Sequence, residues 1–267
     1  MTKEQVTVLP NQVMLDEQRE LVERANQFRL KGFVSELTQQ FTNPLIFNNQ
    51  TFEERLAKCF DEQEAYGRIA RFNTLCKASL IRNKFWMNQL KPSPKRGLTA
   101  EHLELLSQTD YIRKCTNVII TGPTGTGKTS LAIAAALEAM THGYSVRFYR
   151  INDLIGIMEG KDPATFMRFK ESLRKVKLLI LDDYGTVKIN DAAAIKLNEI
   201  ADIRYYSGPT IITSQLKVNA LKEAIDPSPT RDSLADRLFR ANDIRIELGG
   251  TSWRGVDDEI RNSTENV

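Results

Sequence analysis

Residues 122–129 read Gly122-Pro123-Thr124-Gly125-Thr126-Gly127-Lys128-Thr129, which matches the pattern G-x-x-x-x-G-K-[ST] of a phosphate-binding loop. An apolar strand at 118–120 precedes this loop, and a helical pattern at 131–140 follows it. Glycines let backbone N–H groups turn towards phosphate oxygens, and the helix N-terminus adds partial positive charge. We therefore expect the loop and Ser130 to bind ATP. Lys128 would reach the β- and γ-phosphates, and the Thr129 hydroxyl would hold Mg²⁺.

After Gly97, short apolar strands alternate with helical patterns. This alternation predicts the α/β class, with a mostly parallel sheet that is covered on both faces. The strands are expected at 118–121, 145–149, 177–181, 210–213 and 244–247. The helices are expected at 127–141, 152–158, 163–175, 191–206 and 233–240.

The N-terminal part of the chain has a different pattern, with apolar residues at helical spacing between 17 and 40. Gly32 interrupts this pattern and is expected to divide two helices. Thr51 is typical of an N-cap and predicts a long helix over 52–82. A linker rich in proline and glycine follows at 91–97. The sequence thus predicts a helical N-terminal domain at 1–95, which would bind a partner or DNA, and an ATPase domain at 96–267.

Composition places few limits on function. The chain has 267 residues and a net charge of +3, which is ordinary for a soluble protein. Its three cysteines are widely spaced without a CxxC pair, so reduced thiols are expected rather than a zinc site or disulfides. No apolar run reaches the roughly 20 residues that a membrane span needs. A cytoplasmic protein without a membrane partner is expected.

Two carboxylates, Asp182 and Asp183, are further candidate site residues, because they directly follow the expected strand at 177–181. The carboxyl ends of parallel strands face the ligand crevice, although adjacent residues of one strand point to opposite sides. We assign Asp182 to a Mg²⁺-bound water and Asp183 to the attacking water. Solvated acids at a strand end are the alternative.

Gln215 follows the later buried strand at 210–213. Its amide is a candidate hydrogen-bond partner for the γ-phosphate or for the attacking water, and capping of a loop is the alternative.

Arginines suit a γ-phosphate because the guanidinium is forked and permanently charged. Arg237 lies in a helical stretch, and Arg254 follows the last strand. One subunit can supply such a group to its neighbour's ATP, which would link hydrolysis to assembly. Either residue is otherwise a surface ion-pair partner. Arg231 and Arg240 are further candidates.

The chain resembles the IstB-like proteins, the ATPase helpers of insertion-sequence transposition, which are related to the DnaC helicase loaders. The likeness runs from about residue 30 to residue 255. It is carried by Leu30-Lys31-Gly32-Phe33, Thr51-Phe-Glu-Glu-Arg55-Leu56, the phosphate loop, Asp182, Thr213-Ser214-Gln215, Asp236-Arg237-Leu238 and Gly250-Thr-Ser-Trp-Arg254.

This resemblance implies an AAA+ fold and ATP-driven self-assembly into a homo-oligomer on duplex DNA. It also implies cooperation with a cognate transposase at a target site. Gln215 would be the sensor-1 residue, Arg237 the arginine finger and Arg254 the sensor-2 arginine.

Two positions depart from the family, which usually has Glu in place of Asp183 and Asn in place of Gln215. The Asp183 carboxylate would lie roughly 1–1.5 Å further from the water because its side chain is one methylene shorter. We hypothesise slow hydrolysis, with ATP acting largely as an assembly switch.

Residues 65–100 contain no Asp or Glu but carry several cations. Such a surface gains affinity for DNA by releasing counterions from phosphate, although a solvated helix face is the alternative. The candidate DNA contacts are Arg68, Arg71, Lys77, Arg82 and Lys84. No base-reading motif is visible, so weak sequence preference is expected.

Three other functions compete with the transposition helper. A DnaC-like loader of a replicative helicase is the runner-up. A small-molecule kinase would need an arginine-rich lid, which the sequence does not show. The retained Lys128, Thr129 and Asp182 argue against a scaffold without a working nucleotide site.

Overall fold

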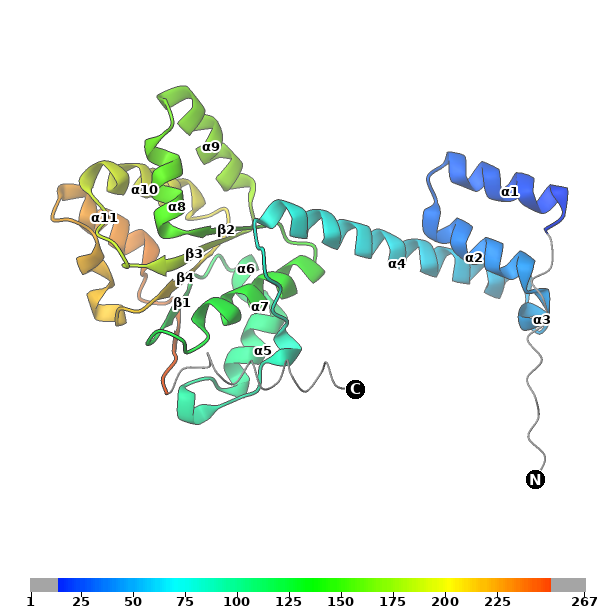
Figure 1. The fold of residues 1–267 in the computed structure, drawn as a ribbon, viewed down its shortest axis with the longest axis horizontal. Coiled ribbons are helices and arrows are strands. Elements are labelled where there is room, and N and C mark those ends of the chain that lie inside the picture. The colour runs from blue at the N-terminus through cyan, green and yellow to red at the C-terminus, as the bar shows by residue number, and fades with distance from the viewer. Residues whose placement is uncertain (1–13, 251–267) are drawn as a thin grey trace. The chain divides into compact units, whose positions relative to one another are not determined.

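The computed structural model describes residues 14–250. The chain divides into two compact units, Met1–Asn73 and Thr74–Val267. The first unit is helical and the second is α/β, as Figure 1 shows. Residues 74–95, which the sequence assigned to the helical domain, belong to the second compact unit. The separate roles of the two domains stay a prediction.

The helical unit contains α1 (Asp16–Gln27), α2 (Lys31–Thr42), α3 (Pro44–Phe47) and the first part of α4 (Phe52–Ser79). The expectation that Gly32 divides two helices is wrong, because Gly32 lies inside α2. The break comes earlier, at Arg29, whose φ is 60°. Gly32 instead allows a close approach to α4: a Cβ at this position would lie 2.4 Å from the carbonyl oxygen of Glu62.

Helix α4 begins as the sequence predicts. The Thr51 N–H donates to the Glu54 carboxylate at 2.9 Å, and the Glu54 N–H donates to the Thr51 hydroxyl at 3.2 Å. Such reciprocal bonds satisfy two backbone donors that a helix start leaves open. The helix ends at Ser79, before the expected residue 82, because Leu80 adopts a φ of 68°. The Ser79 hydroxyl then accepts the Ile81 N–H at 3.2 Å.

The α/β unit is built on a parallel sheet, and five strands pair within residues 14–250 in the order β2-β3-β4-β1-β5. The strands are β1 (Val118–Thr121), β2 (Val146–Arg150), β3 (Leu178–Tyr184), β4 (Thr210–Ser214) and β5 (Ile244–Glu247). All five were predicted, with bounds that differ by at most three residues. The expected α/β class is therefore confirmed.

Helices cover both faces of this sheet (Figure 1). Helix α10 (Asp191–Arg204) contacts α8 (Ile151–Glu159), α9 (Pro163–Lys175) and α11 (Pro229–Leu238), and α7 (Lys128–Thr141) contacts α5 (Ala100–Gln108). The short elements are α6 (Asp110–Arg113), η1 (Met87–Gln89), η2 (Pro94–Arg96) and η3 (Val218–Ala224). The sequence placed the start of α11 too late, because Pro229 occupies its first turn, a position that proline favours.

The core alternates across the sheet as the pleat requires. Ile119, Leu181 and Ile212 pack in one cluster with α8–α11. The intervening residues Ile120 and Ile180 are also fully buried, but outside that cluster. No helix within residues 14–250 is long and apolar enough to cross a membrane.

The sheet order decides where the site lies. Strand β4 has β1 on one side and β3 on the other, and all three run in the same direction. Their carboxyl ends therefore meet at one edge, where ligands bind in open parallel sheets. The loop after β1, the carboxylates of β3 and the polar end of β4 are brought together in this way.

Candidate nucleotide-binding site

The phosphate loop joins β1 to α7 and turns through three glycines with positive φ. The φ angles are 147° at Gly122, 82° at Gly125 and 90° at Gly127. Residues other than glycine rarely adopt such φ angles, so the backbone of this loop requires glycine at these three positions. Gly127 precedes α7, and the helix begins at Lys128. The helix N-terminus therefore points its free N–H groups at the loop.

Lys128 is buried within this loop. Its ammonium donates to the carbonyl oxygens of Gly122 at 2.7 Å and Pro123 at 2.8 Å. The loop thus holds the lysine charge close to the backbone amides that would surround a phosphate. A phosphate in the loop would offer this ammonium a charged acceptor in place of two neutral carbonyls.

Asp182 lies at the centre of the site and is 1% exposed. Its Oδ1 accepts the Thr129 hydroxyl at 2.8 Å and the Thr213 hydroxyl at 2.6 Å. Burial raises the pKa of this carboxyl above its ordinary value, while the hydrogen bonds from Thr213 and Thr129 and the charge of Arg150 lower it. Among residues 14–250, the hydrogen-bond donors to Oδ1 are these two hydroxyls.

A hydroxyl and a carboxylate side by side fit a Mg²⁺ ion. Mg²⁺ prefers hard oxygen ligands and usually takes only one or two from the protein, with water and substrate phosphate completing its shell. Thr129 and Asp182 supply that number. Among the described residues there is no cluster of three or more His, Cys, Asp or Glu that would hold a metal without a phosphate.

Asp183 lines the same pocket as Asp182, although the two are adjacent in the chain. Simple strand alternation predicts opposite sides. The register between β3 and β4 shifts between Leu181 and Tyr184, and Asp183 adopts a φ of 58°. Its N–H donates to the Thr213 hydroxyl at 3.0 Å. This bulge turns both carboxylates towards one pocket.

Gln215 connects the end of β4 to the phosphate loop, because its Oε1 accepts the Thr124 hydroxyl at 2.8 Å. It lines the phosphate pocket together with residues from β2, β3 and the loop. The full lining is Thr124, Gly125, Gly127, Lys128, Thr129, Ser130, Arg150, Asp182, Asp183 and Gln215. Of these residues, only Arg150 was missed by the sequence reasoning. Its position at the end of β2, on the same sheet edge, is the signal that would have found it.

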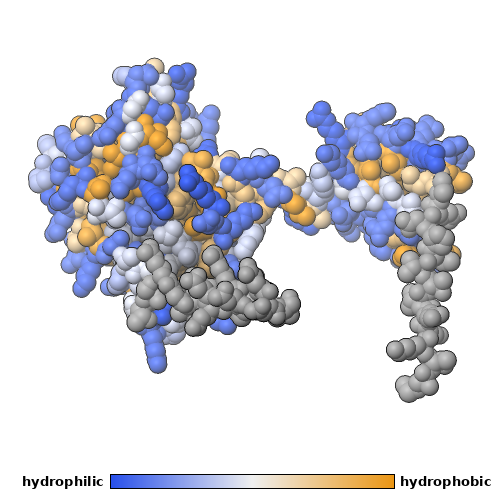
Figure 2. All heavy atoms as spheres, viewed as in Figure 1, coloured by the Kyte–Doolittle hydropathy of each residue, from blue (hydrophilic) through white to orange (hydrophobic). Residues whose placement is uncertain are grey.

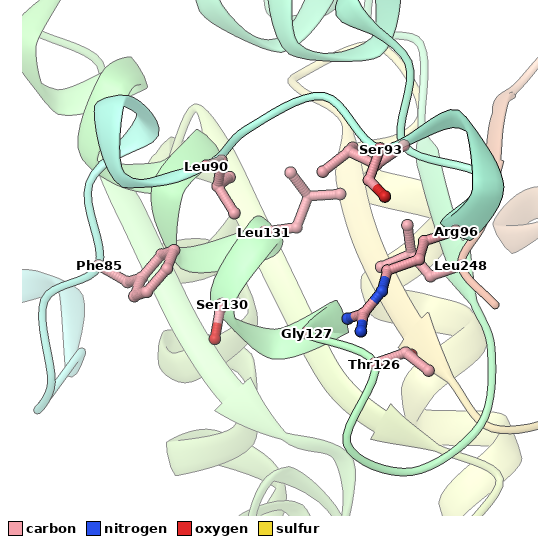
Figure 3. Close-up of a pocket in the computed structure, with 10 residues that line it drawn as sticks. Phe85, Leu90, Ser93, Arg96, Thr126, Gly127, Ser130, Leu131 and Leu248 are labelled. Atoms are coloured by element: carbon pink, nitrogen blue, oxygen red, sulfur yellow. The ribbon is translucent and has the colours of Figure 1, made fainter. Parts of the chain in front are cut away.

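A separate apolar hollow adjoins the loop (Figure 3). Figure 3 shows the side chains of Phe85 and Leu90 on one side and those of Arg96 and Leu248 on the other. Leu131 and Ser130 of α7 also line it. The sequence reasoning treated 91–97 as a linker only. In the structure, Ser93 and Leu98 exchange backbone hydrogen bonds, and this closed turn forms part of the wall.

Arg237 does not line the phosphate pocket. Its Nε and Nη2 donate to Asp202 Oδ1 at 3.0 and 2.9 Å, which ties α11 to α10. Arg254 lies outside the described residues. Arg231 donates to the carbonyl of Lys222, and Arg240 donates to that of Cys115. The arginine-finger and sensor-2 roles therefore stay predictions.

The predicted DNA contacts are divided between the two compact units. Arg68 and Arg71 belong to the helical unit, whereas Lys77, Arg82 and Lys84 belong to the α/β unit. Arg68 forms an exposed ion pair with Glu64 at 3.6 Å. Such a pair contributes little to stability and leaves the role in DNA binding as a prediction.

The comparisons with known proteins identify the family. Residues 23–259 match the family model described as IstB-like ATP binding protein. The chain belongs to this family. An insertion sequence protein of Sinorhizobium fredii, named as ATP-binding, is 39% identical to this IstB-like chain over 229 residues, which are 85% of this chain and 92% of the relative. One from Pseudomonas fluorescens is 34% identical, covering 72% of this chain and 83% of the relative.

Solved structures show the fold of this IstB-like chain. The crystal structure of DnaI covers 64% of this chain and 95% of its own, at 16% identity and a TM-score of 0.53. AMPPCP-bound DnaA from Aquifex aeolicus covers 69% of this chain and 57% of its own, at 21% identity and a TM-score of 0.56. The α/β unit has the AAA+ P-loop fold of these structures, and helices precede it in the chain. Family membership supports ATP as the nucleotide.

Proposed function

We propose that this IstB-like protein is a slow ATPase that self-assembles on duplex DNA with ATP bound and assists the transposase of an insertion sequence. One observation carries the ATPase part. The phosphate loop, the two carboxylates of β3 and the amide that follows β4 line a single pocket. The family and the names of its insertion-sequence relatives support the role in transposition.

Each residue of the pocket has a chemical task in this proposal. The loop amides and Lys128 bind the β- and γ-phosphates, and Thr129 and Asp182 hold Mg²⁺, which neutralises charge on the phosphates when it is bound. Asp183 Oδ accepts a hydrogen bond from the attacking water and so orients it. Gln215 donates its amide to that water or to the γ-phosphate.

The apolar hollow is proposed to hold the adenine ring. It shares Gly127 and Ser130 with the phosphate pocket, so one nucleotide would reach both. Its wall of Phe85, Leu90 and Leu131 suits a flat heterocycle. Phe85→Ala is expected to weaken ATP and ADP binding to the same degree in a competition titration. A loss confined to ATP would contradict the assignment.

Electron microscopy of the full chain with duplex DNA tests assembly. We expect filaments or rings on duplex with a non-hydrolysable ATP analogue and none without nucleotide. Lys128→Ala should abolish them, whereas Lys175→Ala, a matched change of an exposed lysine in the last turn of α9, should not. Assemblies that ignore nucleotide, or that survive in Lys128→Ala, would overturn the proposal.

The choice of partner is tested with the same full-length protein. Capture of the cognate transposase on duplex DNA in the presence of the ATP analogue is expected. Capture of a replicative helicase instead would favour the loader function.

A further inference from the structure

Arg150 is the one arginine that lines the phosphate pocket among the described residues. It is the last residue of β2, an edge strand of the sheet. Its Cα pairs in register with that of Asp182 on the neighbouring strand β3. Thr129, the other residue suited to Mg²⁺, lines the same pocket. The backbone of Arg150 therefore lies beside that of Asp182, the residue whose carboxylate is assigned to the metal.

The Arg150 side chain makes no hydrogen bond or ion pair with any residue between 14 and 250. Arg237, by contrast, is held by Asp202 on α10. A permanently charged, forked donor thus lines the pocket without an acceptor among residues 14–250.

The two neighbouring hollows set the direction of a bound nucleotide. The apolar hollow meets the phosphate pocket at Gly127 and Ser130. Arg150 and Asp182 line the phosphate pocket but not the apolar hollow. A nucleotide with its base in the hollow therefore extends its last phosphate towards Asp182 and Arg150.

We propose that Arg150 contacts the γ-phosphate of ATP bound to its own chain and so makes the site prefer ATP to ADP. This inference rests on the proposed ATP site and adds a residue to it. A guanidinium binds a terminal phosphate through two parallel hydrogen bonds, which ADP cannot offer at the γ position. Because the arginine is supplied in cis, the preference for ATP precedes assembly and needs no neighbouring subunit.

The test compares two nucleotides on the full-length protein with Mg²⁺ and without DNA. Arg150→Ala is expected to weaken the binding of a non-hydrolysable ATP analogue about tenfold, which equals about 1.4 kcal/mol of binding free energy. The same substitution should weaken the binding of ADP less than about twofold. Arg150→Lys should lose part of the preference, because it keeps the charge and loses the fork. Arg245→Ala is the matched control, since Arg245 is an exposed arginine on the opposite edge strand β5.

Several results would overturn this inference. Equal losses for both nucleotides, or no loss, would show that Arg150 does not contact the γ-phosphate. In a separate titration with duplex DNA, a loss of DNA binding by Arg150→Ala with an unchanged preference for ATP would assign the arginine to DNA, together with Arg82, since both line a further pocket. If Arg150→Ala does not fold, Arg150→Lys decides by the same criterion. A wild-type chain that binds no ATP would defeat the proposed function as well, whereas a normal wild type with an indifferent Arg150 would defeat this inference alone.

Discussion

The Thr213 hydroxyl donates to Asp182 Oδ1 at 2.6 Å, and both side chains are almost fully buried. The same hydroxyl oxygen accepts the N–H of Asp183 at 3.0 Å. One threonine on β4 thus orients the carboxylate assigned to the metal and holds the backbone turn that carries the next carboxylate. The geometry of the pocket depends on a strand that is about 30 residues away in the chain.

Removing this hydroxyl should loosen both carboxylates. Thr213→Val keeps the shape of the side chain but leaves the Asp183 N–H without its acceptor. We expect a loss of about 1–3 kcal/mol in the free energy of unfolding, measured with urea, together with slower single-turnover hydrolysis. Thr213→Ser restores the hydroxyl and should recover most of the rate. If the Thr213→Val variant hydrolyses ATP as fast as the Thr213→Ser variant does, the Thr213 hydroxyl has no part in positioning the two carboxylates.

Lengthening Asp183 should speed hydrolysis and lower stability. Glutamate brings its carboxylate roughly 1–1.5 Å closer to the water. Residue 183 has a φ of 58°, however, and aspartate tolerates this left-handed conformation better than glutamate does. We expect Asp183→Glu to raise the single-turnover rate about tenfold and to lower the thermal midpoint. An equal or slower rate would refute the hypothesis that the short side chain limits hydrolysis.

The buried carboxylate of Asp182 should lower the free energy of unfolding of the nucleotide-free protein near neutral pH. Burial is the largest influence on its pKa, which is raised above the ordinary value of 3.8. The folded protein therefore binds this proton more tightly than the unfolded chain does, and the contribution of this group to stability falls as pH rises from about 4 through the raised pKa.

Asp182→Asn removes the charge and keeps an oxygen for the hydroxyls of Thr129 and Thr213. We expect the variant to have a higher thermal midpoint than the wild type at pH 7 and no Mg²⁺-dependent hydrolysis. The difference in midpoint should shrink as pH approaches 4. A variant that is less stable at pH 7 would show that the carboxylate stabilises the fold.

Charge reversal at Arg82 should weaken binding to all duplexes alike. If Arg82 contacts a DNA phosphate, Arg82→Glu should lower the slope of log affinity against log salt by about 1. Fluorescence anisotropy with unrelated duplexes at several salt concentrations measures this slope. Lys175→Glu, on the exposed end of α9, serves as the control. A loss confined to one duplex sequence would contradict a phosphate contact.

The amino-acid sequence by itself determined the strands, the phosphate loop and most of the residues that line the pocket. These features depend on local rules: glycines where φ is positive, apolar runs for buried strands, and polar residues where parallel strands end. Lys128, Thr129 and Asp182 were predictable because each occupies a fixed place next to a strand or a helix.

Only the tertiary structure decided the features that depend on contacts between distant segments. Gly32 lies inside a helix and leaves room for the close approach of α4, which no local pattern indicates. Asp183 faces the same pocket as Asp182 because Thr213 holds its backbone in a bulge against the usual alternation of a strand. Arg150 reaches the pocket because β2 is placed beside β3 by the order of the sheet. Strand order and bulges are set by pairing across the sheet, so they appear only when the chain is folded.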